Sequence, residues 1–383
     1  MLEAPIYLDC AATTPIDPAV RDAMRPYWDE EFGNAGSRTH AWGQRARAAV
    51  EQARDRVAAV AGAARGDVIF TSGATESNNL ALLGIAGAGP GHVVSTAIEH
   101  HAVLGPLAEL ERRGVAVTYV EPDAGGFVTC DRIMAAVRPD TRLVSVMHVN
   151  NETGVVQPIE QIAAALEGSP AYLHVDAAQG FAREIDALRH PRIDLISASA
   201  HKIHGPKGIG ALIVRKRNGV RPPVQPLMFG GGQERGLRPG TMPVALAAGF
   251  GAAAAQALAE RDERRRRCLR FRDALLTGLG PLDPAINGDL ARTAPHIVNL
   301  SFPGLVAEVL IDAWRDLVAV SNGAACSSQS YVCSHVLGAM RLPRWRTDGA
   351  VRISWCASTP EPDWAALVAA ATAFRQLPQA SAS

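Results

Sequence analysis

A lysine in a glycine- and histidine-rich segment is the first residue whose surroundings point to chemistry. Lys202 lies within residues 199–208, SAHKIHGPKG, between two short apolar runs. A lysine at the end of a buried strand is partly desolvated, which lowers its pKa and makes its amine a nucleophile toward a carbonyl group. A surface lysine in a turn is the alternative, and it describes Lys207 better than Lys202.

An aspartate upstream of Lys202 strengthens this interpretation. Asp176 ends the apolar run 172–175 and precedes Lys202 by one strand-to-strand crossover. Pyridoxal phosphate requires a lysine for its imine and an acid against its pyridinium nitrogen. Asp176 could instead cap a helix, but a paired lysine and aspartate favour a pyridoxal-phosphate enzyme.

A phosphate site is the third requirement, and residues 72–79, SGATESNN, could supply it. They form a strand-to-helix turn of small residues, where backbone N–H groups and the Thr75 hydroxyl would make an anion site at a helix N-terminus. The same letters could simply cap a helix. Ser199 and His201 can add donors from the lysine segment.

Cys326 lies among small polar residues, AACSSQS, which indicates an exposed loop thiol. A thiol near cations can ionise and attack sulfur, although an inert loop cysteine fits this segment equally well. The chain has six cysteines, and their scatter does not form a disulfide framework. We therefore expect free thiols in a reducing compartment.

Alternating strand-like and helical runs from about residue 40 to 215 must position these groups. Short continuous apolar strands separated by helices predict an α/β domain with a mostly parallel sheet. A helix is expected over residues 40–60, and strands are expected over 68–71, 93–95, 115–120, 143–147, 172–176, 195–197 and 211–214. An alanine-rich run from 244 to about 276 predicts one long helix, with Gly278 as its C-cap, leading into a smaller α+β domain.

The composition excludes several classes of protein. A chain of 383 residues exceeds the usual size of one core, so we expect two domains. The formal net charge is zero, which gives no general attraction to nucleic acid or to an anionic membrane. No run is long and apolar enough for a membrane span, and the N-terminus lacks a signal-peptide pattern, so the cytoplasm is expected. The arginines at 264–267 are interpreted as a solvated helix face, because acids lie beside them.

Taken together, these segments resemble the cysteine desulfurases of the NifS and IscS type, in the class-V aminotransferase group. The matching motifs follow the family order along nearly the whole chain. They are YLD at 7–9, ATTP at 12–15, FGN at 32–34, TSGATESNN at 71–79, EH at 99–100, MHVNNETG at 147–154, HVDAAQ at 174–179, SAHKIHGPKG at 199–208, GGGQERG at 230–236, GT at 240–241, Cys326 and Arg352.

The resemblance implies a fold-type I pyridoxal-phosphate architecture with a mostly parallel seven-stranded sheet. Residues 16–245 would form the large cofactor domain, and residues 1–15 and 246–383 the small α+β domain that carries the Cys326 loop. It also implies a homodimer, L-cysteine as substrate, a sulfur-acceptor protein as partner, and no metal.

The resemblance also implies a role for each of several residues. Lys202 binds the cofactor covalently, Asp176 partners the ring nitrogen, Gln179 approaches the ring hydroxyl, and His100 stacks on the ring and carries protons. Ala74, Thr75, Ser199 and His201 hold the phosphate, and Thr241 reaches the phosphate of the neighbouring subunit. Asn151, which also lies beside the cofactor, and Arg352 bind the substrate carboxylate, and Cys326 takes the sulfur as a persulfide while alanine leaves.

Three segments, 33–38, 97–100 and 228–233, look most similar to the DndA branch, which serves DNA phosphorothioation. The alternatives are a sulfur donor for iron–sulfur clusters or for tRNA thiolation, a selenocysteine lyase, or an aminotransferase. An aminotransferase would not need Cys326. Cys10, Cys333 and Cys356 depart from the family pattern, and Cys333 either exchanges sulfur with Cys326 or is a structural residue that begins the next helix.

Overall fold

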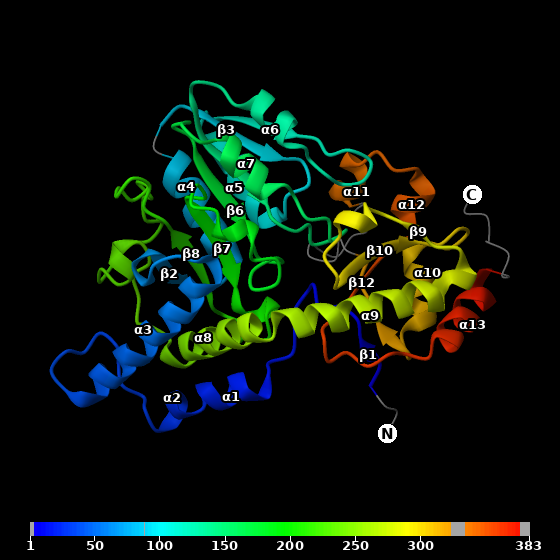
Figure 1. The fold of residues 1–383 in the computed structure, drawn as a ribbon, viewed down its shortest axis with the longest axis horizontal. Helices are drawn as coiled ribbons and strands as arrows, with labels where there is room; N and C mark the ends of the chain where they lie inside the picture. The colour runs from blue at the N-terminus through cyan, green and yellow to red at the C-terminus, as the bar shows by residue number, and fades with distance from the viewer. Residues whose placement is uncertain (1–3, 88, 323–333, 376–383) are drawn as a thin grey trace.

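A seven-stranded sheet forms the centre of the larger part of the molecule (Figure 1). The computed structural model describes residues 4–87, 89–322 and 334–375. The strand order is β2-β8-β7-β6-β5-β3-β4, and only β8 runs antiparallel to its neighbours. The strands are β2 (Val68–Thr71), β3 (His92–Thr96), β4 (Ala116–Val120), β5 (Thr141–Met147), β6 (Tyr172–Asp176), β7 (Leu195–Ser199) and β8 (Gly210–Val214). Each of them covers one of the predicted apolar runs, so the mostly parallel seven-stranded sheet is confirmed.

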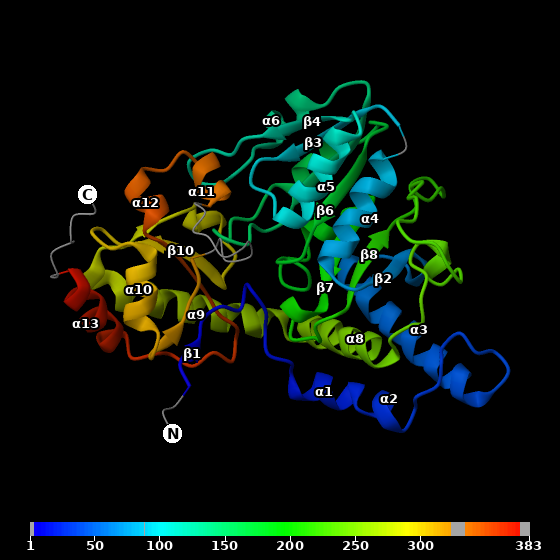
Figure 2. The same ribbon diagram turned by 180° about the vertical axis from the view of Figure 1, so that it is seen from behind.

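Helices bury both faces of this sheet. Side chains alternate along β2, where Val68 and Phe70 join one core and Ile69 joins the other. Figure 2 shows α4 and α5 in front of the sheet, while α3 and α8 cover the opposite face. The helices around the sheet are α1 (Pro18–Met24), α2 (Pro26–Asp29), α3 (Ala41–Ala61), α4 (Ala74–Ala86), α5 (His101–Arg112), α6 (Cys130–Ala136), α7 (Ile159–Ala165) and α8 (Val244–Ala259). Burial on both faces explains why the strands are continuously apolar.

A second core lies around a small antiparallel sheet with the order β12-β10-β9. Trp314 and Trp355 are fully buried in it. Its elements are α9 (Arg261–Leu279), β9 (Ala285–Ile286), β10 (Ile297–Ser301), α10 (Ala307–Trp314), β12 (Ala350–Ser354) and α13 (Trp364–Arg375). Between α10 and β12 in the chain lie α11 (His335–Ala339), whose Val336 and Leu337 join the core of the large sheet, and α12 (Arg344–Asp348). β1 (Ile6–Tyr7) joins this part by pairing with β11 (Val318–Ala319). The division of the chain at residue 245 stays a prediction.

The single long helix expected over residues 244–276 is wrong. α8 ends at Ala259 and α9 begins at Arg261, because Glu260 leaves the helical conformation, with φ −100° and ψ 5°. Gly278 is not the C-cap either, since it lies inside α9. A Cβ at Gly278 would come within 2.5 Å of the Trp364 side chain. The glycine therefore allows α13 to pack closely against α9.

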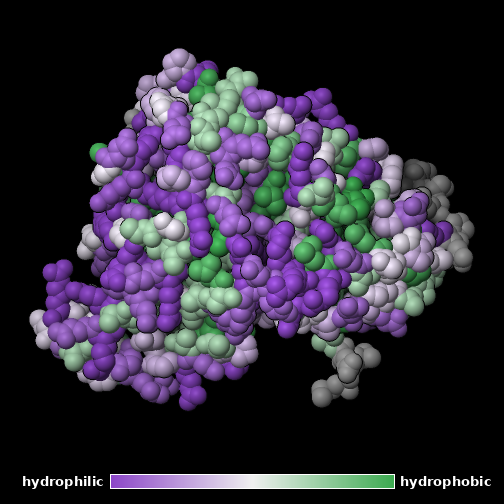
Figure 3. All heavy atoms as spheres, in the orientation of Figure 1, coloured by the Kyte–Doolittle hydropathy of each residue, from purple (hydrophilic) through white to green (hydrophobic). Residues whose placement is uncertain are grey.

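The arginine run at the start of α9 faces solvent and is paired with acids. Arg264 contacts Glu260, Arg266 and Arg267 contact Glu263, and Arg265 contacts Glu184. Hydrophilic side chains gather where these first turns of α9 lie (Figure 3). The prediction of a solvated, acid-paired face is confirmed. None of the helices in the described ranges is long and apolar enough to cross a membrane.

Candidate active site

A pocket of about 550 Å³ opens where the carboxyl ends of the parallel strands meet the small sheet. The residues predicted for the site that line it are Ala74, Thr75, His100, Asn151, Asp176, Gln179, Ser199, His201, Lys202 and Arg352. Thr241 does not line the pocket and is exposed on the loop before α8. Cys326 and Cys333 lie outside the described residues. The fold thus brings together ten predicted residues that are up to 278 positions apart in the sequence.

Lys202 follows directly from the end of β7, in a 3-10 turn over Ala200–Lys202. Its Nζ donates hydrogen bonds to two backbone carbonyls of the N-terminal segment, Ala12 O at 2.8 Å and Ala11 O. The backbone carbonyl of Lys202 accepts a hydrogen bond from Arg183 at 2.7 Å. The Lys202 amine is therefore oriented by the N-terminal segment, which is about 190 positions away in the sequence.

Asp176 is the last residue of β6 and is 5% exposed. One carboxylate oxygen accepts a hydrogen bond from Ala178 N at 3.0 Å, and the other accepts one from Asn78 Nδ2 at 2.8 Å. These two donors stabilise and orient a buried carboxylate. Asn78 has no role among those predicted from the sequence, although it follows Ala74 by one helical turn on α4 and so lies on the same face.

His100 is the N-cap residue of α5, and its Nδ1 accepts a hydrogen bond from Ala102 N at 3.0 Å. In the neutral ring this contact places the proton on Nε2. Burial lowers the pKa of His100, and the nearby Lys202 adds to this effect, while Asp176 opposes it. A neutral imidazole in the pocket is suited to move a proton.

The turn between β2 and α4 contains the residues of the predicted anion site. Gly73, the N-cap residue of α4, makes no side-chain capping hydrogen bond, and Gly73, Ala74 and Thr75 line the pocket. The first N–H groups of a helix have no partner within it, so they are available to an anion. Gly210 of β8 passes directly behind this turn, and a Cβ there would lie 2.6 Å from Gly73 Cα. Only a glycine permits this approach, which brings the Ser199 hydroxyl close to the turn.

Arg352 of β12 brings a cation from the small sheet into the pocket. Its Nη2 donates to Asp9 Oδ1 at 2.6 Å, and its Nη1 donates to Asn151 O at 3.0 Å. The side chain of Arg352 is 3% exposed. The motif at residues 7–9 does not by itself predict this role for Asp9, which fixes the guanidinium that is expected to bind the substrate carboxylate.

Buried polar atoms without partners test which ligand the pocket fits. Five buried atoms that belong to residues lining the pocket have no hydrogen-bond partner among the residues that the structure describes. They are Asn78 Oδ1, Asn151 Oδ1, Gln179 Oε1, Ser199 Oγ and Arg352 Nε. Because buried polar groups are normally hydrogen-bonded, their concentration here indicates a polar ligand. A lysine, a buried carboxylate and a helix N-terminus in one pocket fit pyridoxal phosphate.

Comparisons with known proteins agree with this site. The family model described as aminotransferase class-V matches residues 6–367. A protein named cysteine desulfurase IscS from Vibrio cholerae is 43% identical over 368 residues, which cover 94% of this chain and 90% of that relative.

Two solved structures extend the comparison. DndA from Streptomyces lividans has a TM-score of 0.80 and 46% identity, with 91% of this chain and 99% of that chain covered. SspA in complex with cysteine has a TM-score of 0.80 and 34% identity, and the match covers 91% of this chain and 98% of that chain. The resemblance noted in the sequence is confirmed, and the chain belongs to the class-V aminotransferase family, among its cysteine desulfurases.

Proposed function

We propose that this enzyme converts L-cysteine to L-alanine and retains the sulfur as a persulfide on Cys326. The observation that carries the proposal is the placement of Lys202, Asp176 and Arg352 around one pocket. A lysine and a buried acid suit pyridoxal phosphate, while a fixed guanidinium suits an amino-acid carboxylate. Relatives with 43% and 46% identity support the same assignment.

The residues of the large sheet would hold pyridoxal phosphate. When bound, this cofactor supplies an aldehyde that reacts with amines and a ring that accepts electrons from bonds at the substrate Cα. Lys202 would hold the aldehyde until the substrate amine replaces it. Asp176 would keep the ring nitrogen protonated, and Gln179 would approach the ring hydroxyl. The phosphate would bind the N-terminus of α4, with Ala74, Thr75, Ser199 and His201.

Arg352 and Asn151 would orient the substrate. A guanidinium can bind both oxygens of a carboxylate, which restricts rotation about the bond to Cα. Asp9 already holds the guanidinium at 2.6 Å, so the substrate meets a cation whose position is set before it binds. His100 is then the candidate group that moves a proton between Cα and the neighbouring atoms.

The sulfur step would require Cys326 to approach the pocket. Its Sγ attacks the sulfur of the substrate, so that an S–S bond forms as the bond between sulfur and the substrate Cβ breaks. The electron pair of the broken bond stays with the substrate carbon, which takes up a proton, and alanine leaves. Cysteine and one enzyme thiol are thus converted to alanine and one enzyme persulfide without an external oxidant.

We also propose that the enzyme acts as a homodimer in the cytoplasm and passes its sulfur to an acceptor protein. The exposed position of Thr241 is compatible with a contact to the phosphate of a second subunit. Free thiols at Cys10, Cys130, Cys268 and Cys356 favour a reducing compartment. The pathway that we propose is DNA phosphorothioation, on the likeness of segments 33–38, 97–100 and 228–233 to the DndA branch, because the overall identities to DndA and to IscS, 46% and 43%, are similar.

The experiment that tests the proposed function compares wild type with Cys326→Ser. Wild type should release alanine from L-cysteine when a thiol reductant removes the persulfide. Cys326→Ser should keep the visible absorbance of the cofactor and its spectral change with cysteine, but release little alanine. Alanine release by Cys326→Ser at the wild-type rate would contradict the proposal.

A further inference from the structure

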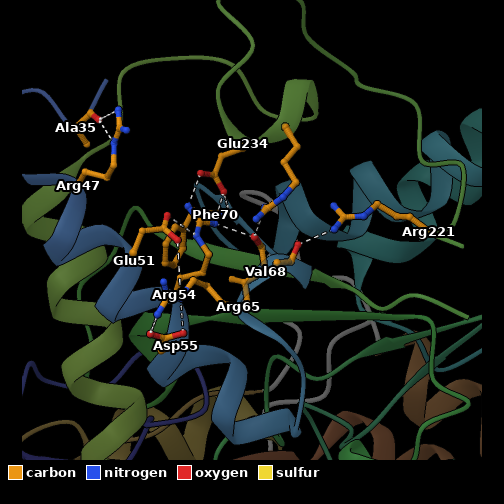
Figure 4. A network of polar contacts seen from close by, with 12 residues as sticks. Ala35, Arg47, Glu51, Arg54, Asp55, Arg65, Val68, Phe70, Arg221 and Glu234 are labelled. Carbon is orange, nitrogen blue, oxygen red and sulfur yellow. Dashed lines mark hydrogen bonds and ion pairs between the residues drawn. The ribbon is translucent and has the colours of Figure 1, made fainter. Parts of the chain in front are cut away.

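The loop between β8 and α8 docks on an open edge of the large sheet. β2 is the outermost strand, so the backbone groups on its free side need partners from outside the sheet. Glu234 accepts a hydrogen bond from Phe70 N at 2.6 Å, and Val68 O accepts hydrogen bonds from Arg54 and Arg235 at 2.8 and 3.2 Å (Figure 4). Side chains therefore close this edge in place of another strand.

A bidentate ion pair fixes Glu234 at this edge. Arg54 of α3 donates from both terminal nitrogens to the two carboxylate oxygens, each at 2.7 Å. The side chains of Arg54 and Glu234 are only 5% and 4% exposed. Glu234 and Arg235 have backbone φ values of 48° and 59°, which residues other than glycine rarely adopt. The buried pair thus holds the loop in a conformation that its own sequence does not favour.

A second ion pair ties the same loop to the start of α4. Arg238 Nε contacts Glu76 Oε1 at 3.0 Å, and Glu76 Oε2 accepts a hydrogen bond from Ser72 N at 2.7 Å. Burial acts to raise the pKa of Glu76, but the contacts with Ser72 and Arg238 outweigh it and lower that pKa. Ser72 opens the turn that carries the candidate phosphate site.

We propose that the pairs Arg54–Glu234 and Arg238–Glu76 are positioning pairs for cofactor phosphate binding. They fix the start of the turn 72–75, because one pair holds Phe70 just before it and the other holds Ser72, its first residue. The inference rests on the proposed function and adds to it that the loop 230–241 controls how tightly the phosphate is bound.

The physical reason is preorganisation. An anion site built from backbone N–H groups has no flexible side chain that could compensate for a displaced backbone. A small shift of β2 or of the first turn of α4 would turn several donors away from the phosphate at once. Lys202 follows the end of β7 and Asp176 ends β6, and neither of these strands is the edge strand, so the reaction of the aldehyde and the binding of the ring should not depend on these pairs.

The test compares two probes on protein stripped of cofactor, namely pyridoxal phosphate and pyridoxal, which lacks the phosphate. Binding is followed by the visible absorbance that appears when the aldehyde reacts with lysine. Glu234→Gln and Arg238→Gln should weaken the affinity for pyridoxal phosphate by at least about tenfold. Their affinity for pyridoxal should stay within about twofold of wild type. Inorganic phosphate should also compete less well in the variants.

Glu263→Gln on α9 is the matched control, because it removes an exposed partner of two ion pairs, to Arg266 and Arg267, that lie outside the turn and the loop. If Glu234→Gln does not fold, the test uses Arg238→Gln alone, because the Arg238–Glu76 ion pair is partly exposed and its loss should destabilise the fold less. An equal loss for both probes would mean general destabilisation and would overturn the proposal, as would no loss for either. Wild-type protein that binds neither probe would instead contradict the proposed function itself.

Discussion

Glu99 offers a test of the electrostatics beside the site, because it is a buried acid that the proposed chemistry does not use. It directly precedes His100 and is fully buried. Its Oε1 accepts hydrogen bonds from Thr96 Oγ1 at 2.6 Å and Met147 N at 2.9 Å. Its Oε2 has no partner within the described parts of the chain. Burial raises the pKa of Glu99 to about 8, so the group should be neutral at pH 7.

The magnitude follows from linkage between protonation and folding. The unfolded chain loses this proton near pH 4.5, whereas the folded chain keeps it to about pH 8. Between these values the folded state binds more protons, so the free energy of unfolding falls as the pH rises. At about 1.4 kcal/mol for each pH unit, the loss amounts to roughly 5 kcal/mol over the whole window and then levels off.

The perturbation is Glu99→Gln, which keeps the shape and the hydrogen-bond acceptor but cannot ionise. Urea unfolding should be measured for wild type and the variant between pH 5 and pH 9. The stability of the variant relative to wild type should increase by about 1.4 kcal/mol for each pH unit up to about pH 8. Glu121→Gln, at an exposed glutamate, is the control and should show no such trend. Parallel curves for wild type and Glu99→Gln would refute the reasoning.

Four further substitutions test the pocket and its surroundings. Lys202→Ala should abolish the visible absorbance and alanine formation, and a borohydride-reducible chromophore in that variant would exclude Lys202. Arg352→Lys should raise the KM for cysteine about tenfold or more with the cofactor still bound, because an ammonium group cannot bind both carboxylate oxygens. Asn78→Ala removes a hydrogen-bond donor from buried Asp176 and should weaken cofactor affinity about tenfold, as measured by absorbance titration. The Cys10 thiol interacts with Cys356, which lowers the pKa of Cys356 and raises that of Cys10, so Cys356→Ser should move the onset of ultraviolet thiolate absorbance to higher pH.

The strands and the main site residues could be predicted from the sequence because they follow local rules. Continuous apolar runs mark strands that are buried on both faces, and Lys202 and Asp176 come at the ends of two of them. Parallel strands bring such ends to one edge, so their proximity follows from the fold class. The phosphate turn likewise follows from a strand that leads into a helix N-terminus.

The partners of these residues could not be predicted in the same way. Asp9 and Arg352 are 343 positions apart, and Glu234 and Arg54 are 180 apart. No local sequence pattern predicts which distant side chains the tertiary fold brings together. The sequence does not reveal the helix break at Glu260, because the residues on both sides of it favour a helix. It also does not reveal why residue 278 is a glycine, because the reason is the close approach of Trp364 in the folded chain.

The most direct test of the central claim is the fate of the sulfur atom. Purified protein should be incubated with isotopically labelled L-cysteine and no reductant, then digested and mapped by mass spectrometry, with alanine measured in parallel. The account predicts one added sulfur atom on the peptide that contains Cys326, matched by one alanine per added sulfur. Added sulfur only on other cysteines, or alanine formed without any added sulfur, would contradict it.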